Sequence, residues 1–173
     1  MGLGIRRVFK IQWQINKHIM LSRFFYYKIP LIGRFISMSM DRFLLIIYGI
    51  ELMSFSVNVQ KLSITHPNGV LLGGNGVFSL GRVVIMSGVK LGGRSPKDEL
   101  YLKKHREQKV FEFGDNVVIG TSSVLLGPLT ICDNVMIGSM SLVNKSINEP
   151  GVYVGIPVKK VSENISYEWV SHL

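Results

Sequence analysis

From Phe113 onward, a large apolar residue recurs at every sixth position. Three of these six residues are followed directly by glycine, and the set is Phe113, Ile119, Leu125, Ile131, Ile137 and Val143. A helix needs a period of about 3.6 and a single strand a period of about 2, so neither explains this stride. Short flat strands joined by corners do explain it, because each sixth side chain stacks on its equivalent in the next coil. The stride predicts a hexapeptide β-helix.

The repeat begins less regularly on the N-terminal side. Steps of eight and seven residues imply bulged corners, and a polar residue, Asn58, falls where an inward residue is expected. The inward positions predicted there are Leu52, Asn58, Ile64, Leu72, Phe78, Ile85 and Leu91. Of the 18 glycines, 14 lie between Gly69 and Gly155, which suits repeated corners. Residues 52–157 without their insertion leave room for roughly five coils of about 18 residues.

A charged stretch, 94–112, interrupts the repeat and predicts a protruding loop. Long insertions in compact folds are usually functional or disordered. The expected organisation is an N-terminal helical segment (1–48), a β-helix domain (49–160) that contains this loop, and a C-terminal tail (161–173).

The N-terminal segment lacks the hexad and carries most of the positive charge. The chain has a net charge of +9, and residues 1–50 account for eight cations against one carboxylate. Helical spacing of Val8, Ile11, Ile15 and Ile19 predicts a first helix. After a break at Pro30, residues 35–48 predict a second. Two interpretations stay open: a cap over the first coil, or a basic, aromatic pair of helices on an anionic membrane surface.

Several classes are disfavoured. The basic start leads to no apolar block with a cleavage site, so a signal peptide is not expected. The uncharged run 43–50 is far shorter than the roughly 20 residues of a membrane span. No recognition motif accompanies the basic charge, which disfavours nucleic acid. The single cysteine, Cys132, excludes an internal disulfide and fits a reducing compartment. We expect a cytoplasmic protein, with peripheral contact at the inner membrane face left open.

Three segments carry a resemblance to a known family: 64–70 (ITHPNGV), 87–93 (SGVKLGG) and 154–159 (VGIPVK). They resemble the aliphatic-x-His-x-x-Gly-aliphatic catalytic segment, the Gly-Val-Thr-Leu-Gly-Gly turn and the closing Gly-Asn-Pro-Ala-Arg signature of the serine acetyltransferase branch of hexapeptide acyltransferases. The resemblance covers residues 50–160 and implies a mainly β fold, a left-handed parallel β-helix. In character the chain is most similar to short members that O-acetylate bacterial surface polysaccharides.

The resemblance implies an acetyl-CoA-dependent O-acetyltransferase with His66 as general base. Glu51 lies 15 residues earlier, where the family places an aspartate that orients the histidine. A carboxylate that holds one ring N–H lets the other nitrogen take a proton from an acceptor hydroxyl. The backbone amides of Gly92 and Gly93 are the implied donors to the thioester carbonyl. For these two glycines, a tight turn is the alternative.

The resemblance also implies a homotrimer with coenzyme A between subunits, and no metal. By motif position, the amides of Thr121 and Ser139 would meet the pantetheine arm. Lys159 or Lys160 would meet the phosphates.

The acceptor site is less defined. Thr65 and Asn68 flank His66, and His105 in the insertion is the candidate for a second family histidine. The family has an aspartate at the position of Thr65, and its large helical domain corresponds here to about 48 residues. Both departures favour a sugar hydroxyl of a capsule, O-antigen or exopolysaccharide, or of its precursor, over free serine. Serine acetylation and a catalytically inactive scaffold remain the alternatives.

Overall fold

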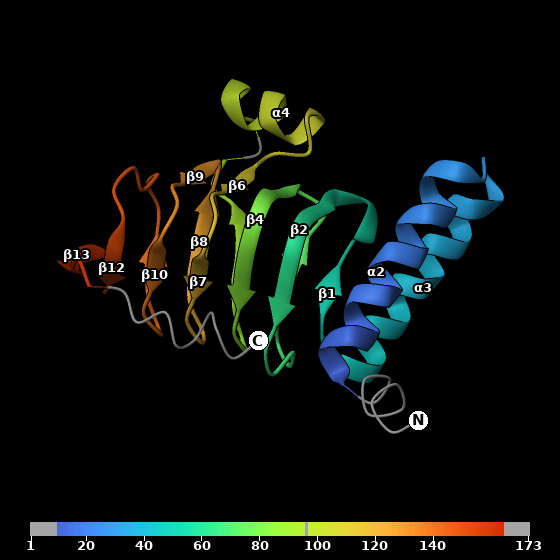
Figure 1. Ribbon diagram of the computed structural model, residues 1–173. Coiled ribbons are helices and arrows are strands. Elements are labelled where there is room, and N and C mark those ends of the chain that lie inside the picture. Colours follow the sequence, from blue (N-terminus) through green and yellow to red (C-terminus); the bar gives the residue numbers. More distant parts are fainter. Residues whose placement is uncertain (1–9, 96, 165–173) are drawn as a thin grey trace.

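The computed structural model describes residues 10–95 and 97–164. Figure 1 shows a stack of short strands with two helices at one end and a third helix above it. The helices are α2 (Ile11–Lys28), α3 (Ile32–Tyr48) and α4 (Glu99–Arg106), with a 3-10 turn, η1 (Ser54–Ser56). The strands are β1 (Glu51–Leu52), β2 (Val57–Ile64), β3 (Leu71–Gly73), β4 (Val77–Ile85), β5 (Lys90–Gly93), β6 (Phe111–Phe113), β7 (Val117–Ile119), β8 (Val124–Gly127), β9 (Leu129–Ile131), β10 (Val135–Ile137), β11 (Leu142–Val143), β12 (Gly151–Val154) and β13 (Lys159–Ser162).

The strands form three parallel faces around one core. The first face has the strand order β1-β3-β5-β8-β11. The long strands β2 and β4 each turn a corner: β4 pairs with β6 through its first residues and with β7 through its last. The second face therefore holds the first halves of β2 and β4 with β6 and β9. The third holds their second halves with β7, β10 and β12.

The predicted six-residue stride is confirmed. All six residues of the stride are at most 5% exposed. Val117 pairs with Val135, 18 residues later, so one coil consists of three hexapeptides. The five strands of the first face agree with the expected five coils. Each coil places its inward side chains on those of the next, which gives one continuous apolar core.

Close stacking of the corners explains why glycine follows some of these residues. A Cβ built on Gly120 would lie 2.7 Å from the carbonyl oxygen of Ile137 and from the amide nitrogen of Ser139. Both contacts are with the backbone of the next corner, which cannot move aside without breaking the stack. The position therefore accepts only glycine.

The inward positions predicted for Asn58 and Phe78 are wrong. Asn58 is exposed and Phe78 partly exposed, whereas Val57 and Val77, one residue earlier, are 2% and 0% exposed. The turn η1 lies between β1 and β2, so five residues rather than six separate the inward Leu52 from Val57. The polar Asn58 is therefore a surface residue, and its apparent conflict with the core disappears.

The insertion is also more ordered than predicted. It contains α4, whose N-cap Asp98 accepts a hydrogen bond from the Leu100 amide at 2.8 Å. The coil resumes earlier than expected, because Val110 and Phe111 are both 0% exposed. The prediction of a protrusion is confirmed, since α4 stands outside the strands in Figure 1.

The helices α2 and α3 cover the open first coil. Ile15, Ile19 and Leu44 belong to the same buried cluster as the strands. The side-chain amide of Gln12 donates to the Leu62 carbonyl at 2.9 Å and accepts from the Ile64 amide at 2.5 Å. Gln12 thus satisfies backbone groups of β2 that a preceding strand would otherwise pair.

The helix bounds differ modestly from those predicted. The second helix begins at Ile32 rather than at residue 35, and the first continues to Lys28. Val8 lies outside the described residues. None of the described helices is long and apolar enough to cross a membrane.

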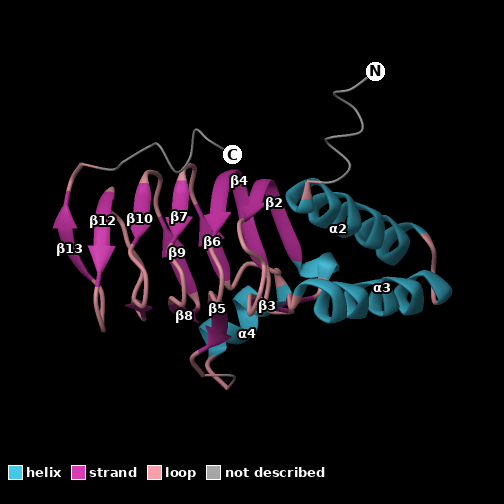
Figure 2. Cartoon of the chain, turned by 90° about the horizontal axis from the view of Figure 1, so that it is seen from below, coloured by secondary structure: helices cyan, strands magenta, loops and turns pink. Residues whose placement is uncertain are grey.

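The other end of the stack closes differently. The last strand, β13, turns back and pairs antiparallel with β12. The reversal ends the parallel ladder, so both ends of the coil are terminated by non-repeating structure (Figure 2).

Candidate active site

His66 lies on one long edge of the molecule, which we call the His66 edge. It is the edge between the third and first faces, built from the corners 65–70, 86–89, 120–123 and 138–141. The first corner stacks on the chain that leaves α3: the Gly69 amide donates to the Gly49 carbonyl at 3.0 Å, and the Glu51 amide to the Val70 carbonyl at 2.9 Å. Glu51 and His66 therefore share this edge.

The His66 side chain is exposed, and its backbone has φ +53°. A positive φ in a residue other than glycine is uncommon. Ser122 and Met140, in later corners of the same edge, have φ values of +58° and +55°. The conformation is therefore a property of these corners, and here it turns an imidazole toward solvent.

Thr65 and Asn68 share the corner with His66. The Thr65 amide donates to the Ile85 carbonyl, and the Asn68 carbonyl accepts from the Gly88 amide at 3.0 Å. Their backbones are thus fixed by the next coil. The Asn68 side chain is exposed and that of Thr65 half-buried, so both can contact a molecule that approaches the imidazole.

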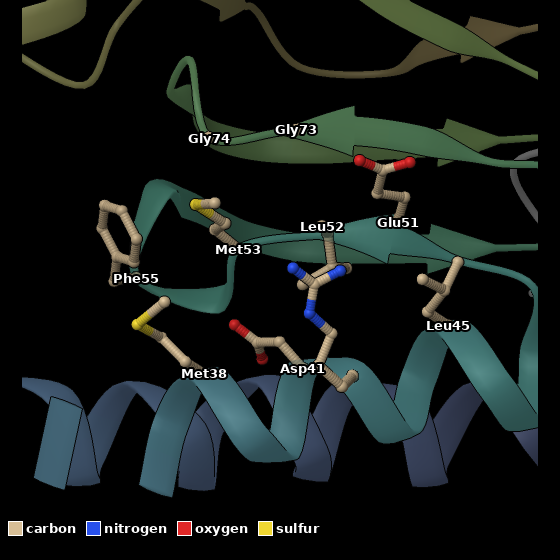
Figure 3. A pocket seen from close by; sticks show the side chains of 10 residues that line it. Met38, Asp41, Leu45, Glu51, Leu52, Met53, Phe55, Gly73 and Gly74 are labelled. Carbon is tan, nitrogen blue, oxygen red and sulfur yellow. The ribbon is translucent and has the colours of Figure 1, made fainter. Parts of the chain in front are cut away.

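Glu51 is exposed and lies at the mouth of a cavity between α3 and the first face (Figure 3). The cavity measures about 140 Å³, and the other residues along it include Arg42, Leu45 and Met53. Within the described residues, no hydrogen bond or ion pair joins Glu51 to His66. The two side chains share an edge, and their contact stays a prediction.

Asp41 also lines this cavity, but its carboxylate has a structural role. It is 7% exposed. Its carboxylate accepts hydrogen bonds from the Ser54 amide at 2.8 Å, the Ser54 hydroxyl at 2.5 Å and the Ser22 hydroxyl at 3.0 Å. No sequence motif predicted this role for Asp41, which is the single acidic residue among the first 50. A lone carboxylate in a basic segment was the sequence signal that could have indicated its structural role.

Thr121 and Ser139 follow His66 along the same edge. The corners of this edge stack directly on one another. The amides of Thr65, Met86 and Gly120 donate to the carbonyls of Ile85, Ile119 and Ile137, each one coil further along. At about 4.8 Å between neighbouring strands, Thr121 and Ser139 lie roughly 10 and 14 Å from His66 along the axis. In the described part of the chain, neither amide donates a hydrogen bond. Both are therefore available to an extended ligand that carries carbonyl oxygens.

The two lysines differ in their surroundings. The Lys160 ammonium lies 3.3 Å from a carboxylate oxygen of Glu149 and 3.6 Å from one of Glu163. Desolvation lowers the pKa of Lys160, but the Glu149 hydrogen bond and the field of Glu163 outweigh it, and the net pKa is raised. Lys159 is exposed and forms no ion pair with a described residue. Of the two, Lys159 is better able to meet a phosphate.

Gly92 and Gly93 lie away from the His66 edge. They end β5, where they pair with Leu126 and Gly127. A Cβ on Gly93 would lie 2.7 Å from the ring of Tyr101, so this position also packs closely. In Figure 1, α4 lies above the strands, whereas β2 points away from it toward the edge where corner 65–70 follows.

His105 lies with the glycines rather than with His66. Its ring centroid is 5.7 Å from that of Tyr101, and the Tyr101 hydroxyl donates to Asn75 at 2.7 Å. This contact fixes α4 on the edge between the first and second faces. Within one chain, one edge carries Glu51, Thr65, His66, Asn68, Thr121 and Ser139, and another carries Gly92, Gly93 and His105. No cluster of metal-ligating side chains occurs in residues 10–95 and 97–164.

Solved structures define the class of fold. The structure of serine acetyltransferase from Brucella abortus strain S19 superposes with a TM-score of 0.73 at 18% identity, over 88% of this chain and 57% of that one. The Neisseria gonorrhoeae serine acetyltransferase gives a TM-score of 0.71 at 21% identity, over 90% and 57%. The chain has the left-handed β-helix fold of these proteins, as predicted. At these identities the likeness shows the fold alone.

The relatives found by sequence comparison are also serine acetyltransferases. The chain is 34% identical over 109 residues to serine acetyltransferase from Staphylococcus aureus (strain Mu50 / ATCC 700699), which is 63% of this chain and 47% of the relative. It is 36% identical over 110 residues to the Staphylococcus xylosus serine acetyltransferase, over 63% and 46%. The chain thus spans about half the length of these relatives. No protein-family model matches it.

Proposed function

We propose that the protein is an acetyl-CoA-dependent O-acetyltransferase in which His66 is the general base. The observation that carries the proposal is the composition of the His66 edge. An exposed imidazole and a carboxylate lie at one end of this edge, and the unpaired amides of Thr121 and Ser139 follow along it. This arrangement suits an acceptor hydroxyl at one end and a long thioester along the coils. One solved relative is described as a complex with coenzyme A.

The chemistry follows from the residues of the edge. His66 takes the proton of the acceptor hydroxyl as its oxygen attacks the thioester carbonyl. The carbon–sulfur bond then breaks, and the imidazolium returns the proton to the departing thiolate. Glu51 holds the other ring nitrogen and stabilises the imidazolium. No covalent intermediate with the protein is required.

The position of α4 bears on the proposed assembly. Because Gly92, Gly93 and His105 lie on a different edge from His66, they can contribute to its reaction only from another copy of the chain. We therefore include the homotrimer in the proposal, with its sites between subunits. The exposed flat faces of the coil offer natural interfaces for it.

Two acceptors remain, and different observations favour them. The named relatives are serine acetyltransferases, which favours L-serine over the sugar that the sequence departures favoured. Thr65, in place of the family's aspartate, favours a neutral hydroxyl acceptor such as a sugar of a surface polysaccharide. We take L-serine as the first acceptor to test and the sugar as the second.

The test measures thiol release from acetyl-CoA with L-serine and, separately, with a panel of hexoses and nucleotide sugars. Mass spectrometry identifies the acetylated product. Serine-dependent release assigns the first acceptor, and release only with sugars assigns the second. If no hydroxyl compound accelerates release and calorimetry detects no coenzyme A binding, the protein is a scaffold and the proposal fails.

A further inference from the structure

The turn between α2 and α3 exposes a compact group of large apolar side chains. Leu31, Ile32 and Phe35 are 81%, 70% and 75% exposed, and Lys28 and Arg34 are exposed beside them. We call these five residues the tip patch. Figures 1 and 2 both show this turn at the end of the helix pair that is far from the strands.

Covering the coil does not require these side chains. The helices contact the core through Ile15, Ile19 and Leu44, which are at most 7% exposed. Leu31 has φ +57° and ψ −71°, a conformation that glycine adopts without strain and leucine does not. A large apolar side chain therefore stands at a strained, solvent-facing apex where it has no packing role within the chain. Such an outlier indicates a function outside the fold.

The charges around the tip patch are of one sign. Between residues 10 and 48 the single carboxylate, Asp41, is buried and hydrogen-bonded to Ser22 and Ser54. The exposed charges of α2 and α3, which include Lys17 and Arg42, are all cationic. The tip of the hairpin thus combines aliphatic and aromatic side chains with positive charge. This composition matches the boundary between acyl chains and anionic headgroups.

We propose that the tip patch docks the protein on an anionic lipid surface, with Leu31, Ile32 and Phe35 entering the headgroup boundary and Lys28 and Arg34 meeting lipid phosphates. A second copy of the chain is the competing occupant. In a two-fold contact between tips, each patch would face its own equivalent, so Lys28 and Arg34 would approach the same cations of the other copy. That repulsion favours lipid. The inference does not depend on the acetyltransferase proposal.

The test is flotation of the whole protein with vesicles of phosphatidylglycerol and phosphatidylcholine. We expect the protein to float with these vesicles, to float less at high salt, and to stay in solution with phosphatidylcholine alone. Changing Leu31→Ser together with Phe35→Ser is expected to lower the bound fraction about tenfold, because most of the inserted apolar area is lost. Lys28→Glu with Arg34→Glu is expected to lower flotation with phosphatidylglycerol vesicles to the level seen with phosphatidylcholine alone.

The matched control is Leu80→Ser, which removes a leucine that is 75% exposed on the coil. It should float as the unchanged protein does. Circular dichroism establishes that the variants are folded. The proposal is overturned if the unchanged protein stays in solution with both vesicle types, or if the tip variants float normally. It is also overturned if they lower the molecular mass in solution without changing flotation, since the tip then binds a second copy.

Discussion

The first two coils and the last coils share one architecture but differ in regularity. Between β7 and β10 and between β8 and β11, equivalent residues lie 18 positions apart. In the first coil the spacing is 20 from Glu51 to Leu71 and 21 from Leu62 to Val83. The additional residues lie at the corners within β2 and β4, where seven residues separate Val57 from Ile64 and eight separate Val77 from Ile85, and at the corner of His66. The core tolerates no extra residue, so extra length and chemistry are both found at corners.

Replacing the His66 imidazole is the strongest test of the separation between a regular core and functional corners. His66→Asn keeps a residue that tolerates a positive φ and removes the base. We expect about a 10²- to 10⁴-fold loss of kcat/KM with an unchanged melting temperature. Asn116→Ser is the control, because Asn116 has φ +55° at a regular corner, and it should keep full activity. Full activity in His66→Asn would refute the assignment.

Cavities in the core should show that the two regions are equally well packed inside. Leu91 and Leu125 pair across β5 and β8, and both are 0% exposed. Each change to alanine should cost about 2–5 kcal/mol of unfolding free energy, and the two values should agree. Urea denaturation measures both. A much smaller loss for Leu91 would mean that irregularity extends into the core of the early coils.

The cap should matter less than the core. Gln12→Ala leaves the Ile64 amide without its acceptor, and we expect a loss of about 1–3 kcal/mol. Gln60, an exposed glutamine of β2, is the matched control, and Gln60→Ala should change stability by less than about 0.5 kcal/mol. Equal losses in the two variants would show that the side-chain cap contributes nothing specific.

The smallest effect concerns pH. Burial lowers the pKa of His18 below its usual 6.5, against the opposing field of Asp41, and its Nε2 is buried without a partner. A lowered pKa means that protonation disfavours the folded state. Stability is therefore unaffected above about pH 6.5, and it falls as the pH drops toward the folded-state pKa. Melting temperatures across this range should fall less for His18→Gln. An identical fall would exclude His18 as the cause.

The regular coils were predictable because a stride of six leaves one arrangement that buries every sixth side chain. The early coils were less so. Asn58 and Phe78 were assigned inward because a count of six overshoots two short steps: five residues separate Leu52 from Val57, across η1, and five separate Leu72 from Val77. The helix α4 was missed because its apolar residues, Leu100 to Leu102, are consecutive and show no helical period, and none of its residues is buried. The Asp98 cap and the close approach of Tyr101 to Gly93 hold it in place. Neither contact is visible as a period.

The site was predictable in part. The segment around His66 and its pairing with Glu51 were expected from the resemblance to the acetyltransferase family, and the contact between the two side chains stays a prediction. The placement of Gly92, Gly93 and His105 was not expected, because a motif fixes neighbours along the chain but not the edge on which they lie. The roles of Gln12 and Asp41 depend on side chains that reach between elements distant in sequence, which no local pattern reports.

Because both ends of the stack are closed, the number of coils sets the distance between His66 and Lys159 along the axis. Helices stop the stack on one side and the reversed strand β13 on the other, so the interval between His66 and Lys159 is a whole number of strand spacings. Splicing one more 18-residue turn between Val117 and Val135 would preserve both terminations and lengthen that interval by about 4.8 Å. The edge between these two residues would then match a longer bound molecule.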